Sequence, residues 1–387
     1  MTRTLTITGV LLASLGASPA LSQTSRVIDL GSIGGPTQAS SVNASGVVAG
    51  ASLGDVASGS RYHAFRWRGV LEGIDPLAGD LDSHAFAVTD SGMAYGMSFS
   101  VGRLGARTFA AGADGVPVLV GDFAARGANN SGALVGSQRA LTPNGLETRN
   151  ACEFRDGTLL VLPGLGGESS AAAAITENDL IVGWVATVNG MSTHAALWRD
   201  GAVHDLGTLG GSRSQALHAN SAGVVVGVSQ TPGGQMHAFA FQTDSSGGVV
   251  SRQDLGTLGG GASTAMGINN VGTVVGTSDD RAFVFASGQM TDLNASLPSD
   301  SGWLLPGAAA INDRGLVAGW GKHHGVPAAF LFTPCGADFD NNGTVDTRDV
   351  LAFLNAWVGR APVADFNDDG IINTQDVLAF LNAWNAG

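Results

Sequence analysis

Short apolar runs separated by glycine, asparagine and aspartate recur along most of the chain. Within them, apolar residues alternate with polar ones or are β-branched, as in Val-Val-x-Gly and His-Ala-Phe-x-Trp segments. Such spacing is typical of short strands that bury one face. The chain also holds 58 glycines among its 387 residues, which indicates many tight turns. The pattern predicts an all-β fold over most of the length.

Three motifs repeat along this region at a period of about 44 residues. DLGTLGG stands at 205–211 and 254–260, with relatives DLGSIGG at 29–35 and LPGLGG at 162–167. An Asn-containing turn followed by Val-Val-x-Gly comes next, and then His-Ala-Phe or a relative. The glycines of Val-Val-x-Gly align seven copies, 40 to 49 residues apart: Gly50, Gly96, Gly136, Gly183, Gly227, Gly276 and Gly319.

Each unit reads as four strands, because it contains four runs and is too short to be a domain. Five copies carry Asn-x-x-Gly between the first two strands, which is the signature of a type I turn. Seven four-stranded units predict a seven-bladed β-propeller over 23–333; the alternative is an open β-solenoid. The segment 26–30 looks like a fourth strand without its unit, while the last unit stops at Phe332. We therefore expect the first strand to complete the last blade and remove two exposed edges.

At these motifs the chain resembles the extracellular HAF-repeat family, named for its His-Ala-Phe triplet. The resemblance covers roughly 26–332 and is good in units one, five and six. It implies secretion and a propeller-like fold, but no particular chemistry.

Several residues of the repeat region could carry chemistry. His63, His194 and His237 recur at one place in the unit, which favours a structural role, since catalytic residues break a repeat's symmetry. Ser52 lies in a GxSxG pattern, yet the repeat itself explains it. Paired acids in the segment 72–82 could serve glycoside cleavage, although acids in a loop are usually solvated.

Tryptophans are the better candidates for a ligand site, because aromatic rings stack on sugars. Trp67 and Trp198 share a strand position and are expected in the core. Trp303 has no counterpart in other units and falls in the segment 294–307, which we expect to be a loop. We predict Trp303 as the stacking platform for a glycan, if the ring carries such a site.

The net charge of −13 and its distribution change the picture at the C-terminus. From Gly336 onward there are eight Asp and two Arg. Clustered carboxylates repel one another unless a cation lies between them. The negative balance also argues against nucleic acid as a partner, since phosphate binding needs a basic patch.

Residues 1–22 read as a signal peptide: Arg3 precedes an apolar run, and small residues precede Gln23. That run is too short to cross a membrane, and no other run is long enough. A secreted or cell-surface protein is therefore expected. Two cysteines, Cys152 and Cys335, leave open whether one disulfide forms.

Two twelve-residue segments, 27 residues apart, fit a calcium loop. Each has oxygen-bearing side chains at positions 1, 3, 5, 9 and 12, a backbone carbonyl at 7 and glycine at 6. Such donors suit two Ca²⁺ ions, whereas zinc would favour His or Cys. The predicted ligands are Asp338, Asp340, Asn342, Thr344, Asp346 and Asp349, then Asp365, Asn367, Asp369, Ile371, Asn373 and Asp376.

Each loop leads into the same segment, VLAFLNAW, at 350–357 and 377–384. Its apolar residues fall at helical spacing, and in the first copy Val350, Leu351, Phe353, Leu354 and Trp357 predict one broad apolar face. Two such helices are expected to pack together.

Paired loop–helix units with Asp at position 12 resemble type I dockerins, and the resemblance covers about 336–387. It implies calcium-dependent binding to a cohesin-like domain on a scaffold or cell surface. The FLNAW helices and Cys335 depart from the usual pattern. Positions that contact the partner in that family map to Thr347, Arg348, Thr374 and Gln375.

The sequence thus predicts a signal peptide (1–22), a propeller (23–333) and a calcium module (334–387). The favoured function is non-enzymatic: a binding or display propeller attached through the calcium module, with a glycan as a candidate ligand. The alternative is a polysaccharide-degrading enzyme, a glycoside hydrolase or lyase, with its site on the propeller loops.

Overall fold

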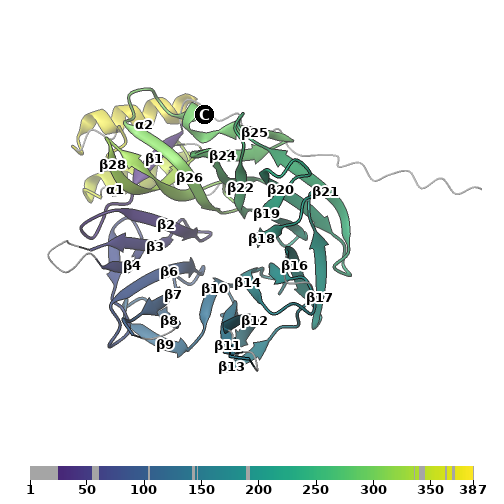
Figure 1. Ribbon diagram of the computed structural model, residues 1–387. Helices are drawn as coiled ribbons and strands as arrows, with labels where there is room; N and C mark the ends of the chain where they lie inside the picture. The colour runs from purple at the N-terminus through teal and green to yellow at the C-terminus, as the bar shows by residue number, and fades with distance from the viewer. Residues whose placement is uncertain are drawn as a thin grey trace, which may run out of the picture.

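The computed structural model describes residues 25–54, 61–102, 105–141, 144–145, 147–188, 192–334, 336–339, 345–361, 364–367 and 371–386. In this part of the chain, seven four-stranded antiparallel sheets stand around a central axis (Figure 1). The predicted seven-bladed propeller is confirmed, and the alternative of an open solenoid is wrong. The predicted signal peptide lies outside the described residues.

Every blade is formed by strands that follow one another in the chain, except the last. Blades 1 and 2 contain β2 (Thr37–Val42), β3 (Val48–Leu53), β4 (Tyr62–Trp67) and β5 (Leu71–Ile74), then β6 (Asp82–Val88), β7 (Ala94–Phe99), β8 (Arg107–Ala111) and β9 (Pro117–Gly121). Blades 3 and 4 contain β10 (Ala124–Ala128), β11 (Leu134–Leu141), β12 (Glu147–Arg155) and β13 (Thr158–Val161), then β14 (Ser170–Ile175), β15 (Ile181–Ala186), β16 (Thr193–Arg199) and β17 (Ala202–Gly207). Blades 5 and 6 contain β18 (Ser214–Ala219), β19 (Val224–Gln230), β20 (Met236–Thr243) and β21 (Val249–Gly256), then β22 (Ser263–Ile268), β23 (Val274–Ser278), β24 (Arg281–Ala286) and β25 (Gln289–Asp292). Blade 7 contains β26 (Trp303–Ile311), β27 (Val317–His323), β28 (Val326–Thr333) and β1 (Arg26–Asp29).

The ring closes through its first strand, as expected from the sequence. β1 pairs antiparallel with β28, with Arg26 opposite Thr333 and Asp29 opposite Phe330. Val27 is 7% exposed and packs among the apolar residues of blades 6 and 7. The strand that begins the described chain thus covers the outer edge of the last blade.

The innermost strand of every blade carries a β-bulge at the same place. A bulge leaves one residue unpaired and bends the strand. The unpaired residues line the central channel and differ in character from blade to blade: Ser40, Phe86, Arg126, Ala173, Leu217, Met266 and Ala309.

The bulge explains the glycine of the Val-Val-x-Gly motif. A Cβ on Gly50 would lie 2.1 Å from the carbonyl oxygen of Gln38 and 2.8 Å from the Phe65 ring. A Cβ on the equivalent glycine of each of the other six blades would lie 2.0 to 2.5 Å from a carbonyl oxygen of the inner strand. The repeat therefore needs glycine because two backbones approach there, not for a special turn.

The Asn turns connect the blades as well as forming the predicted hairpins. Asn43 Oδ1 accepts hydrogen bonds from the backbone N–H of Ser45 (3.1 Å) and Val47 (2.8 Å). Its Nδ2 donates to the carbonyl of Thr89 in blade 2, at 2.9 Å. The same side-chain bond to the next blade recurs from Asn129, Asn220, Asn269 and Asn312.

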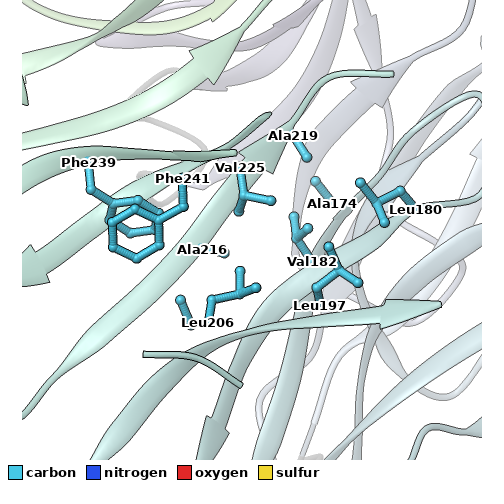
Figure 2. Close-up of a cluster of buried hydrophobic side chains, with 11 residues drawn as sticks. Ala174, Leu180, Val182, Leu197, Leu206, Ala216, Ala219, Val225, Phe239 and Phe241 are labelled. Carbon is cyan, nitrogen blue, oxygen red and sulfur yellow. The ribbon is translucent and has the colours of Figure 1, made fainter. Parts of the chain in front are cut away.

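The apolar core lies between neighbouring blades. Figure 2 shows one such layer, in which side chains of blades 4 and 5 meet. Leu197 of β16 and Val225 of β19 are fully buried there, and the rings of Phe239 and Phe241 lie 4.1 Å apart. The Phe of His-Ala-Phe is thus a core residue, and each blade depends on its neighbours for burial.

The described C-terminal part contains helices α1 (Thr347–Val358) and α2 (Thr374–Ala386), beside blade 7 (Figure 1). A short 3₁₀ helix, η2 (Leu293–Ser296), precedes blade 7. Phe353 of α1 and Phe380 of α2 stack at 4.3 Å and an interplanar angle of 8°. Both predicted helices are confirmed, and they pack together.

The broad apolar face predicted for each helix is wrong. Phe353 is buried, but Leu351 is 62% exposed, and its counterpart Leu378 is 61% exposed. The buried face of each helix is narrower than predicted. Phe339 and Phe366, from the two loops, pack edge-on against the stacked rings and fill the rest of the core. The leucines are left facing solvent.

Candidate functional site

The two predicted calcium loops are described at eight of their twelve ligand positions. These are Asp338, Asp346, Asp349, Asp365, Asn367, Ile371, Asn373 and Asp376. The other four, Asp340, Asn342, Thr344 and Asp369, lie outside the described residues. Across the described parts of the chain, no three His, Cys, Asp or Glu side chains form a metal-binding group.

The aspartates at position 12 are the most buried polar groups of the module. Asp349 and Asp376 are both 0% exposed. Asp349 Oδ2 accepts from the backbone N–H of Asp346 at 2.8 Å, and Asp376 Oδ2 accepts from that of Asn373 at 2.7 Å. Each carboxylate, in the first turn of its helix, therefore binds the backbone of position 9 in its own loop. Burial of a charge is costly unless it is paired or coordinates a metal.

Position 9 of each loop joins the two halves of the module. Trp357 of α1 donates from Nε1 to the carbonyl of Asn373 (2.8 Å), and Trp384 of α2 donates to the carbonyl of Asp346 (2.9 Å). Each helix is thus hydrogen-bonded to the loop of the other unit, and the two loop–helix units are connected reciprocally. An identical Trp in each FLNAW segment is visible in the sequence, but its bond to the other unit is seen only in the structure.

The second loop also contacts the propeller. Arg26 of β1 donates from Nη2 to the carbonyl of Asp365, and its guanidinium carbon lies 5.1 Å from the centre of the Phe366 ring. Positions 1 and 2 of the second loop therefore lie against the strand that closes the ring.

The residues predicted to contact a partner are exposed. Thr347 and Arg348 begin α1, and Thr374 and Gln375 begin α2. Leu351 lies one turn beyond Thr347 and is also exposed. The start of each helix thus offers polar groups beside an uncovered leucine.

Trp303 begins β26 and does not lie in a loop, which corrects its expected position. Its ring stacks on His323 at 4.5 Å with an interplanar angle of 5° and meets Phe330 edge-on. His323 Nδ1 in turn lies 3.0 Å from Asp29. One face of the Trp303 ring is thus already covered, and glycan contact at Trp303 stays a prediction.

Two of the recurring histidines lie against a carboxylate of the Asp-Leu-Gly motif. His194 Nδ1 lies 2.9 Å from Asp205, and His237 Nδ1 lies 2.9 Å from Asp254. Both aspartates belong to the Asp-Leu-Gly motif and also accept the backbone N–H of the motif glycine. His63 lies farther from Asp75, at 3.9 Å.

The serine of the GxSxG pattern and Glu72 of the acidic segment both have partners within the propeller. Ser52 is fully buried, and its Oγ accepts the backbone N–H of Ile33 at 2.9 Å. In the acidic segment, Glu72 pairs with Arg66 and Arg68. Desolvation raises the pKa of Glu72, but the hydrogen bonds from both arginines outweigh it and lower that pKa overall. A carboxyl group with a lowered pKa is poorly suited to act as a general acid.

Cys152 of β12 is a free, buried thiol, and burial raises its pKa to about 12. Cys335 lies outside the described residues. Among the described helices, none has the length and apolar character needed to cross a bilayer.

No protein-family model matches the sequence, and no curated protein matches it significantly. Similar solved structures share 11% to 14% identity. TolB from Acinetobacter baumannii (14%, TM-score 0.41) aligns over 64% of this chain, which spans 61% of TolB. A gluconolactonase of Xanthomonas campestris (13%, TM-score 0.40) aligns over 80% of this chain and 89% of its own. Acylaminoacyl peptidase of Pyrococcus horikoshii (11%, TM-score 0.48) aligns over 76% and 51%. At this level the likeness says nothing about activity.

Proposed function

We propose that this protein is a secreted binding propeller attached to a scaffold or cell surface through a calcium-loaded, dockerin-type module. The observation that carries the proposal is the reciprocal bonding of the two loop–helix units through Trp357 and Trp384. It makes both loops depend on one another's geometry, as a paired calcium module requires.

The described donors fit Ca²⁺. They are carboxylate, amide and backbone oxygens, the ligands that this hard cation takes. Asp349 and Asp376 bring a buried carboxylate to position 12 of each loop. Bound calcium would offset the repulsion among the carboxylates of the module, and its binding free energy would add to folding. Asp338 and Asp365 would hold it at position 1.

The helix starts supply the proposed contact surface. Arg348 and Gln375 are exposed at equivalent places, and Leu351 and Leu378 leave apolar surface beside them. Exposed apolar groups rimmed by polar ones are typical of protein–protein sites. A cohesin-like domain is the partner that this surface is proposed to bind.

A capture experiment with the intact chain tests the proposal. The immobilised protein should retain a purified cohesin domain, or a protein of its own cell envelope, in calcium but not in chelator. Asp338→Ala with Asp365→Ala should abolish capture, and Arg348→Ala with Gln375→Ala should weaken it about tenfold or more, as loss of a contact worth 1.4 kcal/mol would do. Asp300→Ala, at an exposed aspartate outside the module, is the matched control. Capture that persists in chelator would contradict the proposal.

A further inference from the structure

A cleft of about 840 Å³ opens between blades 2, 3 and 4, at the end of the ring opposite the Asn turns. Its walls come from β7, from β10 and from the hairpin of β11 and β12, and they carry Phe99, Phe123 and three arginines. The volume is in the range of small-molecule sites.

Arg126 lies where this cleft meets the central channel, since it lines both. It is the unpaired residue of the β10 bulge. The same place in the other six blades holds uncharged residues, Ser40, Phe86, Ala173, Leu217, Met266 and Ala309. Arg126 is exposed, and its side chain has no hydrogen bond or ion pair with any described residue. It breaks the symmetry of the repeat, which a structural residue would follow.

Arg139 and Arg149 form the second unusual feature of the cleft. They stand directly opposite each other on β11 and β12. Like charges in that position destabilise a sheet. Arg139 is paired with Glu147, whereas the guanidinium of Arg149 has no partner among the described residues. The fold gains nothing from Arg149 at this place, which points to a ligand.

The hairpin that presents these arginines is longer than its counterparts. β11 and β12 stay paired as far as Leu141 opposite Glu147. This paired extension of β11 and β12 forms the wall that carries Arg139 and Arg149. In a chain of net charge −13, a cleft with three arginines against Asp122 and Glu147 is a local positive site.

We propose that this cleft binds a short acidic saccharide through its carboxylate or sulfate groups, which Arg126 and Arg149 recognise. Arginine's planar donors match both oxyanions. Phe99 supplies a half-buried ring beside them for an apolar sugar face. Three arginines suit a ligand with a few charges, whereas nucleic acid would need an extended basic surface. The proposal does not rest on the calcium module.

Titration calorimetry on the intact chain in calcium tests this inference. A trimer of galacturonic acid and a sulfated trisaccharide separate the two oxyanions, and the methyl ester of the acid trimer is a neutral ligand of similar shape. At least one acidic ligand should bind, more weakly as salt rises, and the ester should bind at least tenfold more weakly. Arg126→Gln and Arg149→Gln should each reduce affinity tenfold or more. Arg314→Gln, at an exposed arginine on an Asn turn, should not.

Stability separates recognition from a structural role. Arg149→Gln should melt no lower than the parent, because it removes a like-charge pair. Asp338→Ala with Asp365→Ala should keep saccharide binding, so that failure of the module and failure of the cleft are distinguishable. Absence of binding to both acidic ligands by folded protein would overturn the proposal, as would equal binding of the ester or unchanged affinity in Arg126→Gln with Arg149→Gln.

Discussion

Asn312 in blade 7 donates from its side-chain amide to the backbone carbonyl of Asn43 in blade 1, at 2.9 Å. Residues 269 positions apart thus meet where the ring closes. This bond belongs to a series in which five blades reach to the next. In blades 2 and 4 the same position holds Thr89 and Thr176. Their hydroxyls accept a backbone N–H within their own turn and do not reach the next blade.

The two natural residue types allow the bond between blades to be tested by itself. Asn312→Thr should keep the acceptor for the turn N–H groups but lose the donor, at a cost of about 1 kcal/mol in the free energy of unfolding. Asn312→Ala loses both and should cost about 2 to 3 kcal/mol. Thr89→Asn should stabilise the ring, because the new side-chain amide can donate to the backbone carbonyl of Asn129 in blade 3. Denaturant unfolding would measure all three, and a parent-like midpoint for Asn312→Thr would show that the bond contributes nothing.

Calcium should stabilise the helical module inside the intact chain. With free calcium about a thousand times above Kd, binding contributes about 4 kcal/mol. We expect chelator to reduce the circular dichroism signal of the helices, and Asp338→Ala with Asp365→Ala to show the reduced signal in calcium. Asp300→Ala should behave as the parent does. A signal that is identical with and without chelator in the parent would be the opposite result.

Removal of β1 should open the ring. Deleting 25–30 uncovers the edge of β28 and removes the buried Val27 and Leu30. The truncated protein should aggregate or unfold well below the melting temperature of the parent, because an unpaired edge and apolar surface are exposed together. Scanning calorimetry with light scattering measures both effects. A truncated chain as stable as the parent would mean that another contact closes the ring.

His218 should make the propeller sensitive to acid. It lies in β18 beside the channel, its Nδ1 is buried without a partner among the described residues, and burial lowers its pKa from 6.5. The unfolded chain then binds a proton that the folded chain resists, so stability falls as pH drops below about 6.5, the usual histidine value. Alanine occupies the equivalent position in three other blades (Ala87, Ala174 and Ala310). The His218→Ala variant should therefore fold, and it should lose less stability than the parent between pH 7 and pH 5. An equal loss in both proteins would place the acid sensitivity elsewhere.

The sequence predicted the ring because each repeat carries its own strand and turn signals, and because segment 26–30 matched the strand missing from the last unit. It could not show that the Asn43 amide reaches another blade, since that contact depends on how blades pack. The repeat could not show that β11 and β12 stay paired as far as Leu141 opposite Glu147, because this extension has no counterpart in the other units. The helical spacing placed Leu351 on the same apolar face as Phe353. Periodicity alone could not show that the packed stripe would centre on the Phe353–Phe380 stack and leave Leu351 exposed.

The place of β1 has a consequence for how the chain folds. Thr333 donates from its hydroxyl to the carbonyl of Arg26, across 307 positions. Among the described residues, β1 is synthesised first and must wait for β28 before it finds its partner, and such distant pairing slows folding. Blades 1 to 6 can form in the order of synthesis. Closure comes late, when Asp365, only 32 residues after Thr333, also becomes available to Arg26.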